Sequence, residues 1–315
     1  MPSKALLTIP VRFSNHLAFA PDLTQVAVQP TLAEPGTTEI YSLSDGSLLA
    51  SLSITDDTSP WPCQLVYVGD AIVYLECWEN DVRRWRVVRH RRPDWSREIL
   101  AESMAGHVVK LGAIPGGFVV VAPDHFLLGT ADGPLSDPVW HPTLADGEAM
   151  LLTTDLASGR IAVTLDDTER LIVFDADLQV LGETELHQNE AYDAWFCGSE
   201  TLVTFGMFQA IRSWRIEDGS LAVQGHTWLP KEDVQFSDYT WPLGLTAMPS
   251  RSLISFARAS GPPLWYNART LETVAEPPGF GDWFPVWLSP GDRYAIVQDH
   301  SGLQVYDLSA RRDRR

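Results

Sequence analysis

The stretch Leu288-Ser-Pro-Gly-Asp-Arg-Tyr-Ala-Ile-Val297, followed by Ser301-Gly-Leu-Gln-Val-Tyr-Asp-Leu308, decides the fold. It places a Pro-Gly-Asp turn before a short run of β-branched and aromatic residues. After a second turn, a further apolar segment ends in Tyr-Asp. Short β-branched runs between tight turns are typical of antiparallel hairpins. This stretch therefore predicts consecutive antiparallel β-strands.

Similar apolar runs occur seven times along the chain. They begin at residues 25, 71, 117, 160, 201, 252 and 293, so the intervals between them are 41 to 51 residues. That period is the length of one β-propeller blade. The runs are Gln25–Val28, Ala71–Leu75, Gly117–Val121, Arg160–Thr164, Thr201–Phe205, Ser252–Phe256 and Arg293–Val297.

Two further markers surround each run. A turn rich in Gly, Pro, Asp or Ser precedes it, which makes the run the second strand of its repeat. A segment with a large central residue follows as a third strand: Glu39–Ser42, Arg84–Val87, Phe126–Leu128, Ile172–Asp175, Arg212–Arg215, Pro263–Tyr266 and Gln304–Asp307. In several repeats a glycine turn and a fourth strand come next, as at Ser47–Ser51 and Ser220–Val223. Four strands repeated seven times predict a propeller.

The predicted fold is all-β, a single closed seven-bladed β-propeller of four-stranded blades in residues 1–310. The blades are expected near residues 13–52, 61–101, 107–143, 148–187, 190–229, 238–276 and 283–308. The seventh repeat lacks a fourth strand, and residues 4–11 form a spare strand at the N-terminus. Because an open sheet edge exposes unpaired backbone groups, we expect residues 4–11 to complete the last blade. Residues 311–315 form a charged tail.

Leu288–Val297 resembles the first turn of WD40-like and YVTN-like propellers, and Ser301–Leu308 resembles their third strand. Ile172–Asp175 is a second, weaker match. The resemblance implies a ring completed by an N-terminal strand. The sequence departs from typical WD40 repeats because no repeat carries their Gly-His dipeptide, and Tyr-Asp and Phe-Asp replace Trp-Asp. The buried Asp-His-Ser/Thr-Trp network of typical members cannot be placed.

Composition limits the classes of function. The formal net charge is −18, which disfavours nucleic acid and anionic membranes as partners. The three cysteines, Cys63, Cys77 and Cys197, are too few and too scattered for a disulfide framework or a zinc ribbon. No run of 18 apolar residues and no signal peptide is found. We expect a cytoplasmic monomer.

Motifs that carry chemistry are absent from the sequence. The eight histidines form no H-x-H or H-x-x-x-H pair, and there is no G-x-S-x-G nucleophile turn or phosphate loop. No catalytic residue, metal site or cofactor is therefore predicted, and a non-enzymatic role is favoured. Ligands that converge from several blades leave no linear motif, so an enzyme with a site in the central channel remains the alternative.

Aromatic residues recur in the loops that lead into the innermost strands, where propellers usually bind their partners. The predicted partner-binding rim consists of the aligned positions Phe13, Trp61, His107, Trp241 and Asp282, the adjacent Trp283, and Tyr192 from a repeat of uncertain register. Two repeats of uncertain register offer Glu148 and Glu190. Acidic neighbours are Asp56, Asp57, Asp193 and Asp238. Aromatic faces ringed by carboxylates suit basic peptides, whereas the alternative is ordinary packing between blades.

A cluster of arginines stands out against the acidic background. Seven lie within 15 residues: Arg83, Arg84, Arg86, Arg89, Arg91, Arg92 and Arg97. They are expected on the third strand of the second repeat and in the loop that follows it. One interpretation is an anion-binding patch, formed by the first six. The other is internal pairing with nearby acids and with the neighbouring blade.

The sequence thus predicts a non-catalytic scaffold that binds a protein or peptide through the aromatic and acidic rim, and the acids suit a basic partner. Two alternatives stay open. One is a propeller hydrolase or lyase with a site in the central channel. The other is a subunit that binds a small polar ligand, such as a sugar stacked on the tryptophans.

Overall fold

The structure is a computed structural model. It describes residues 5–11, 14–30, 37–53, 61–78, 84–103, 109–165, 169–186, 193–206, 210–217, 219–229, 245–256, 263–276, 287–299 and 301–309. In these ranges the regular structure is almost entirely β. Its helical segments are short 3-10 turns: η1 (Pro142–Asp146), η3 (Pro249–Arg251) and η4 (Pro290–Asp292). No helix in the described ranges is long and apolar enough to cross a membrane.

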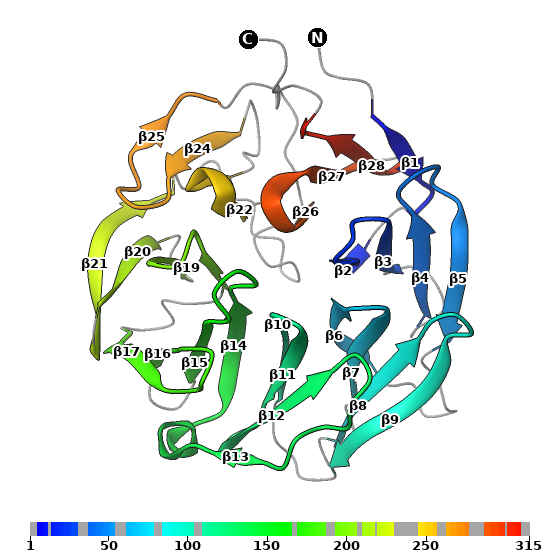
Figure 1. The fold of residues 1–315 in the computed structure, drawn as a ribbon. Coiled ribbons are helices and arrows are strands. Elements are labelled where there is room, and N and C mark those ends of the chain that lie inside the picture. Colours follow the sequence, from blue (N-terminus) through cyan, green and yellow to red (C-terminus); the bar gives the residue numbers. More distant parts are fainter. Residues whose placement is uncertain are drawn as a thin grey trace. The chain divides into compact units, whose positions relative to one another are not determined.

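Three four-stranded antiparallel sheets form in the first part of the chain (Figure 1). In each of them the strands follow one another in sequence order. The first contains β2 (Ser14–Phe19), β3 (Gln25–Pro30), β4 (Thr37–Ser42) and β5 (Leu48–Ser53). The second contains β6 (Trp61–Val68), β7 (Ala71–Trp78), β8 (Arg84–Arg91) and β9 (Ser96–Ser103). The third contains β10 (Lys110–Ile114), β11 (Gly117–Val121), β12 (His125–Thr130) and β13 (Val139–Trp140).

The next two repeats share one eight-stranded sheet. Its order is β14-β15-β16-β17-β21-β20-β19-β18, so the last strands of two repeats lie side by side. They pair in parallel, with Gly182 opposite Gly219 and Glu183 opposite Ser220. The strands are β14 (Ala149–Thr154), β15 (Ile161–Leu165), β16 (Arg170–Phe174), β17 (Val180–Glu185), β18 (Asp193–Phe196), β19 (Thr201–Phe205), β20 (Ala210–Glu217) and β21 (Gly219–Trp228).

Two further four-stranded sheets complete the described strands. One contains β22 (Leu245–Met248), β23 (Leu253–Phe256), β24 (Leu264–Asn267) and β25 (Thr273–Val274). The other contains β26 (Trp287–Leu288), β27 (Tyr294–Asp299), β28 (Gly302–Asp307) and β1 (Leu7–Ile9). The Leu6 amide donates to the Val305 carbonyl at 2.7 Å, and the Thr8 hydroxyl donates to Gln304 Oε1 at 2.8 Å. Residues within 4–11 thus add a strand to the sheet of the last repeat.

The seven predicted apolar runs are the second strands of the repeats. They coincide with β3, β7, β11, β15, β19, β23 and β27, within one residue at their starts. All residues of β11, β15 and β19 are buried, as expected for strands with protein on both faces. The predicted third strands likewise coincide with β4, β8, β12, β16, β20, β24 and β28. Strand identity and order were therefore predicted correctly for these segments.

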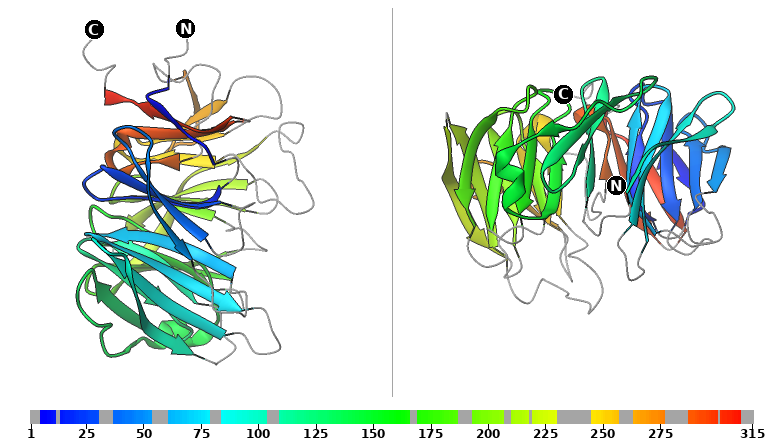
Figure 2. Two further views of the ribbon diagram at one scale, coloured as in Figure 1. Left: turned by 90° about the vertical axis from the view of Figure 1, so that its right-hand side faces the viewer. Right: turned by 90° about the horizontal axis from the view of Figure 1, so that it is seen from below.

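Packing divides the chain into two compact units. The first comprises Met1–Thr8, Arg160–Ala162 and Glu169–Arg315, and the second comprises Ile9–Gly159 and Val163–Thr168. The prediction of one domain over residues 1–310 stays a prediction. In the second unit, the sheet β6–β9 is covered on both faces. The strands of this sheet, light blue to cyan, lie side by side in the left view of Figure 2.

Each face of the sheet β6–β9 packs against a neighbouring sheet. On one face, Ile72, Tyr74 and Val88 pack against residues of β2–β5, including Ala27 and Ile40. On the other face, Val73, Leu75, Trp85 and Val87 pack against residues of β10–β12, including Phe118 and Val120. Apolar burial of this kind is the main contribution to the stability of the sheets. In the first unit, Val203, Phe205, Ile254 and Tyr266 form a comparable core.

Candidate functional site

The predicted rim falls mostly outside the residues that the structure describes. Phe13, His107, Tyr192, Trp241, Asp282 and Trp283 lie there, as do the neighbouring acids Asp56, Asp57, Glu190 and Asp238. Trp61 is the first residue of β6, and its backbone pairs with that of Cys77. The assignment of Trp61 to the rim stays a prediction.

Two of the rim's acidic neighbours are described. Asp193 is the exposed first residue of β18, and its Oδ1 atom accepts a hydrogen bond of 2.9 Å from the amide of Ala194. Glu148 is half-buried and directly precedes β14. Both residues therefore lie at the entry to the first strand of a repeat, which is the position that the sequence predicted.

The arginine cluster is distributed over the two faces of the sheet β6–β9. Because side chains alternate along a strand, Arg84 and Arg86 project with Val88 toward the sheet β2–β5. Arg89 and Arg91 project with Trp85 and Val87 toward the sheet β10–β13. Arg92 lies in the turn after β8, and Arg83 lies outside the described ranges. These arginines therefore do not form one continuous surface.

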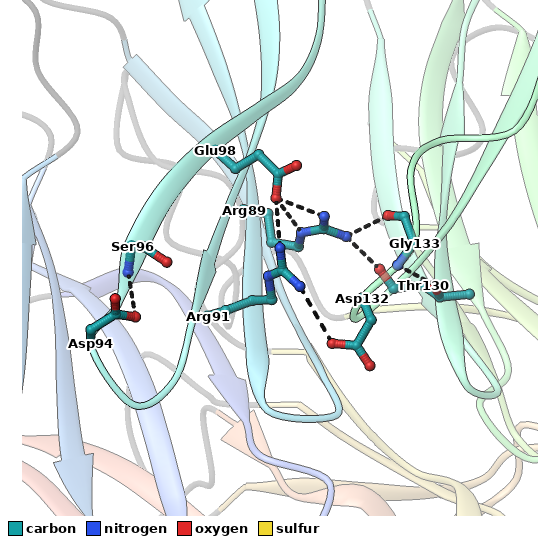
Figure 3. A network of polar contacts seen from close by, with 8 residues as sticks. All are labelled: Arg89, Arg91, Asp94, Ser96, Glu98, Thr130, Asp132 and Gly133. Carbon is teal, nitrogen blue, oxygen red and sulfur yellow. Dashed lines mark hydrogen bonds and ion pairs between the residues drawn. The ribbon is translucent and has the colours of Figure 1, made fainter.

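Arg89 is buried, with 1% of its surface exposed, and all of its donors that the structure places are directed at protein oxygens. Nε and Nη2 donate to Glu98 Oε2 at 3.3 and 2.7 Å. Nη1 donates to the carbonyl oxygens of Thr130 and Gly133 at 3.1 and 2.6 Å (Figure 3). Arg89 thus joins β9 to the loop that follows β12. Its inclusion in an anion-binding patch was wrong, because a buried, paired guanidinium offers no exposed donor.

The contacts around Arg89 extend to a second arginine. Arg91 Nη2 donates to the same Glu98 oxygen at 3.2 Å, and Arg91 Nη1 lies 3.6 Å from Asp132 Oδ1 (Figure 3). The hydrogen bond from Arg89 holds the pKa of Glu98 below its usual value, with further lowering by the charges of both arginines. Glu98 therefore stays ionised at neutral pH and neutralises part of the cluster.

The face toward the sheet β2–β5 is also paired. Glu102 Oε2 accepts hydrogen bonds from Arg86 Nε at 2.8 Å and from Arg84 Nη2 at 3.5 Å. The fully buried Glu76 accepts two from Arg97 Nη2, at 3.2 and 3.3 Å. The internal-pairing interpretation therefore describes Arg84, Arg86, Arg89, Arg91 and Arg97.

A buried Tyr-His pair lies beside these ion pairs. The hydroxyl of Tyr74 lies 2.6 Å from Nε2 of His90, and His90 Nδ1 lies 2.8 Å from the carbonyl oxygen of Trp95. A carbonyl only accepts, so Nδ1 carries a proton and donates, and Nε2 accepts from Tyr74. Burial lowers the pKa of His90, which keeps the ring neutral at pH 7. This arrangement holds the turn between β8 and β9 and provides no free base.

The acidic partners of the cluster were not identified from the sequence, although a signal was present. The segment Ser96–Ser103 follows the arginine-rich strand after a short turn and carries two acids, Glu98 and Glu102. The structure pairs Glu98 with Arg89 and Glu102 with Arg86 across β8 and β9. Opposite charges at directly facing positions stabilise a pair of strands. Within the described ranges, no group of three or more His, Cys, Asp or Glu side chains is placed to hold a metal ion.

Comparison with known proteins gives similarity in structure but not in sequence. No protein-family model and no curated protein sequence matches the chain. A chain of the crystal structure of the mitotic checkpoint complex is similar over 98% of this chain and 95% of its own, with 14% identity and a TM-score of 0.64. The C-terminal WD40 domain of Sif2 is similar over 94% and 81%, with 11% identity and a TM-score of 0.60.

A structure of another class is similar as well. A putative 6-phosphogluconolactonase from Bacteroides uniformis matches over 82% of this chain and 83% of its own, with 13% identity and a TM-score of 0.58. Identities this low show the fold and not the activity. The successive four-stranded antiparallel units and these likenesses agree on one architecture. The chain has an all-β propeller fold that is shared with WD40 proteins.

Proposed function

We propose that this chain is a non-catalytic scaffold that binds a protein or peptide at the aromatic and acidic rim of a propeller. The observation that carries the proposal is the likeness to WD40 structures, one of which is a chain of a multiprotein complex. Rigid aromatic side chains are frequent anchors of protein interfaces. The residues assigned to the rim are Phe13, Trp61, His107, Tyr192, Trp241, Asp282 and Trp283.

The finer architecture belongs to the same proposal. We infer seven four-stranded blades in a closed ring, formed as one domain by residues 1–310. The pairing of β1 with β28 supports this, because it gives the last repeat a fourth strand. Five separate four-stranded sheets and two sets of four in the joined sheet are compatible with seven blades. An experimental structure that gave six or eight blades would contradict the inference.

The partner's chemistry follows from the charge of the chain. A net charge of −18 and acids beside the rim favour a basic peptide or protein segment and disfavour nucleic acid or an anionic membrane. Asp193, exposed at the start of β18, is an acid that such a segment would meet. We place the protein in the cytoplasm as a monomer.

Affinity capture from the native host's lysate tests the proposal. The wild type is compared with a Trp61→Ala/Trp241→Ala/Trp283→Ala variant whose fold is verified by circular dichroism. Trp228→Ala is the control, because Trp228 is exposed on the outer strand β21. A protein retained by the wild type and by Trp228→Ala, but lost by the triple variant, supports the rim. A protein retained equally by all three contradicts it.

A propeller enzyme is the second candidate, favoured by the likeness to the putative 6-phosphogluconolactonase structure. Propellers can assemble a site in the central channel from side chains of several blades. Assay of the purified chain against phosphorylated and unphosphorylated sugar lactones, with and without added divalent metal, tests this candidate. Turnover above the uncatalysed rate would favour the enzyme over the scaffold.

A further inference from the structure

We infer that Trp140, together with the pair Asp124 and His125, forms a binding site for an arginine side chain of a basic peptide. The site lies on the two outer strands of the sheet β10–β13, with Trp140 on β13 and His125 on β12, and not at the innermost strands where the rim was placed. The inference rests on the proposed function only for the basic character of the partner. The contacts of the three residues carry the rest.

Trp140 is unusually exposed for its type. It shows 66% of its surface to solvent, more than any other large hydrophobic residue for which the structure gives an exposure. Its neighbour Val139 is 38% exposed. Tryptophan is enriched among the residues that dominate binding energy at protein interfaces. Trp140 contributes little to the core of its sheet, so its exposure calls for another role.

The backbone around Trp140 is held in place. The backbone of His141, which follows Trp140, donates to the Asp124 carbonyl at 2.9 Å, and its ring caps η1 by accepting from the Thr143 amide at 3.3 Å. Prolines at 138 and 142 restrict the backbone on either side. A pre-ordered backbone loses little entropy on binding. The same prolines shorten the strand edge, which favours recognition by side chains over addition of a strand.

Electrostatics select a cation as the occupant. The ring of Trp140 lies 5.0 Å from that of His125 between centroids, and His125 Nδ1 lies 2.6 Å from Asp124 Oδ1. A carboxylate only accepts, so Nδ1 of His125 donates to Asp124. Asp124 is 44% exposed and keeps a second oxygen for a ligand. An indole face and a carboxylate both favour a guanidinium donor.

The register keeps the nearest lysine of this sheet away from the site. Lys110, Val121, Phe126 and Val139 form one row across the sheet, so they share a face. Trp140 pairs with His125 in the next row and projects to the opposite face. The site therefore presents acid and aromatic groups on a face that Lys110 does not share. It lies at the end of the sheet where β10 begins.

Trp228 provides a matched control. It is 58% exposed on the outer strand β21, and its ring lies 5.2 Å from that of His226, so it shares the Trp-His contact. The residue paired with His226 across the sheet is Arg212. The Trp228 site therefore has a cation beside its histidine, where the Trp140 site has the acid Asp124. If exposed tryptophan alone bound arginine, both sites would act alike. If the carboxylate matters, only the Trp140 site binds.

Fluorescence anisotropy of a labelled hexa-arginine peptide at about 0.15 M salt tests the inference. We expect Trp140→Ala to raise Kd three- to five-fold and Asp124→Asn to raise it by a similar factor, because an exposed cation–π contact contributes modestly. Trp140→Phe should restore part of the affinity. Trp228→Ala should leave the Kd for the hexa-arginine peptide unchanged. A labelled hexaglutamate peptide should show no specific binding.

Two results would overturn the inference. One is an unchanged Kd in both Trp140→Ala and Asp124→Asn, since each variant removes a different component of the site. The other is an equal rise in Trp228→Ala, which would mean that the peptide responds to any exposed tryptophan. The peptide assay is independent of the lysate capture with the rim variant. Failure of one proposal therefore leaves the other to be judged on its own result.

Discussion

Arg89 Nη1 donates a hydrogen bond of 2.6 Å to the carbonyl oxygen of Gly133, 44 residues further along the chain. The same nitrogen donates to Thr130, so one buried guanidinium fixes the end of β12 to the sheet β6–β9. The cluster that suggested an anion site in the sequence thus contributes to the packing of neighbouring sheets. Links separated by about one repeat recur, as in the hydrogen bond from the Tyr67 hydroxyl to Gln25 Oε1 at 2.7 Å.

Arg89→Met should lower the free energy of unfolding by about 2–4 kcal/mol, because two carbonyl oxygens lose a buried charged donor. Urea unfolding followed by circular dichroism measures this change. Arg91→Met is the control, since Arg91 is partly exposed and surface ion pairs contribute about 0–1 kcal/mol. Equal losses in the two variants would contradict a special role for Arg89.

Gly182→Ala should disrupt the parallel pairing of β17 with β21. A Cβ atom at this position would lie 2.5 Å from the Ser220 carbonyl oxygen, which leaves no room for a methyl group. We expect a loss of about 1–3 kcal/mol and faster amide exchange at the start of β21. Gly116→Ala is the control, because its Cβ would meet nothing within 4 Å. It carries only the backbone strain of φ +70°, about 1–2 kcal/mol. Unchanged exchange in β21 of Gly182→Ala would contradict the prediction.

Asp292→Ala should destabilise the contact between η3 and η4. The buried carboxylate of Asp292 accepts a hydrogen bond of 3.1 Å from the Ser250 amide and a further one from the Ser250 hydroxyl. Its φ of 54° is one that aspartate and asparagine tolerate better than alanine. We expect a loss of about 2–4 kcal/mol for Asp292→Ala and a smaller one for Asp292→Asn. Thermal unfolding of both variants compares them, and an equal loss would contradict the argument from backbone conformation.

Stability should fall as the pH is lowered from about 6.5 to 4, in part because of His16. Burial lowers the pKa of His16 from its usual value of 6.5 to about 4. Below pH 6.5 the unfolded chain therefore binds a proton that the folded chain does not, which favours unfolding. At 1.36 kcal/mol per pKa unit, the loss at pH 4 is on the order of 3 kcal/mol.

His16→Gln separates this effect from the titration of other groups. The variant lacks the titrating ring, so its free energy of unfolding should change less than that of the wild type between pH 7 and pH 4. Urea unfolding at both pH values gives the difference. A variant whose stability changes with pH as much as that of the wild type would contradict the assignment to His16.

The order of strands could be predicted from the sequence because the second strands of the repeats are short β-branched runs bounded by turns. Gly117–Val121 and Thr201–Phe205 coincide with β11 and β19 residue for residue. At Arg160, Ser252 and Arg293 the strands begin one residue later than predicted. A polar residue directly after a turn can belong to either element, so the pattern does not determine the first residue.

Other features depend on contacts that no local pattern contains. The pairing of β17 with β21 requires that Gly182 and Gly219 meet although they are 37 residues apart in sequence numbering. Arg89 can be buried because two backbone carbonyl oxygens of another sheet accept its hydrogen bonds. Every residue has a backbone carbonyl, so the sequence does not reveal which ones will serve as acceptors. The predicted rim residues Phe13, Trp241 and Trp283 lie outside the described ranges, so their assignment to the rim stays a prediction.

The parallel pairing of β17 with β21 has a consequence for how this chain can diverge. Most repeats here end in an outer strand that pairs only within its own sheet. Such a repeat can be exchanged, duplicated or lost without breaking strand pairing between its outer strand and another repeat. The two repeats that share the eight-stranded sheet are joined by backbone pairing of their outer strands, with Gly182 opposite Gly219 and Glu183 opposite Ser220. A recombination point between residues 186 and 193 would separate two mutually dependent halves. These two repeats should therefore be inherited as a single module.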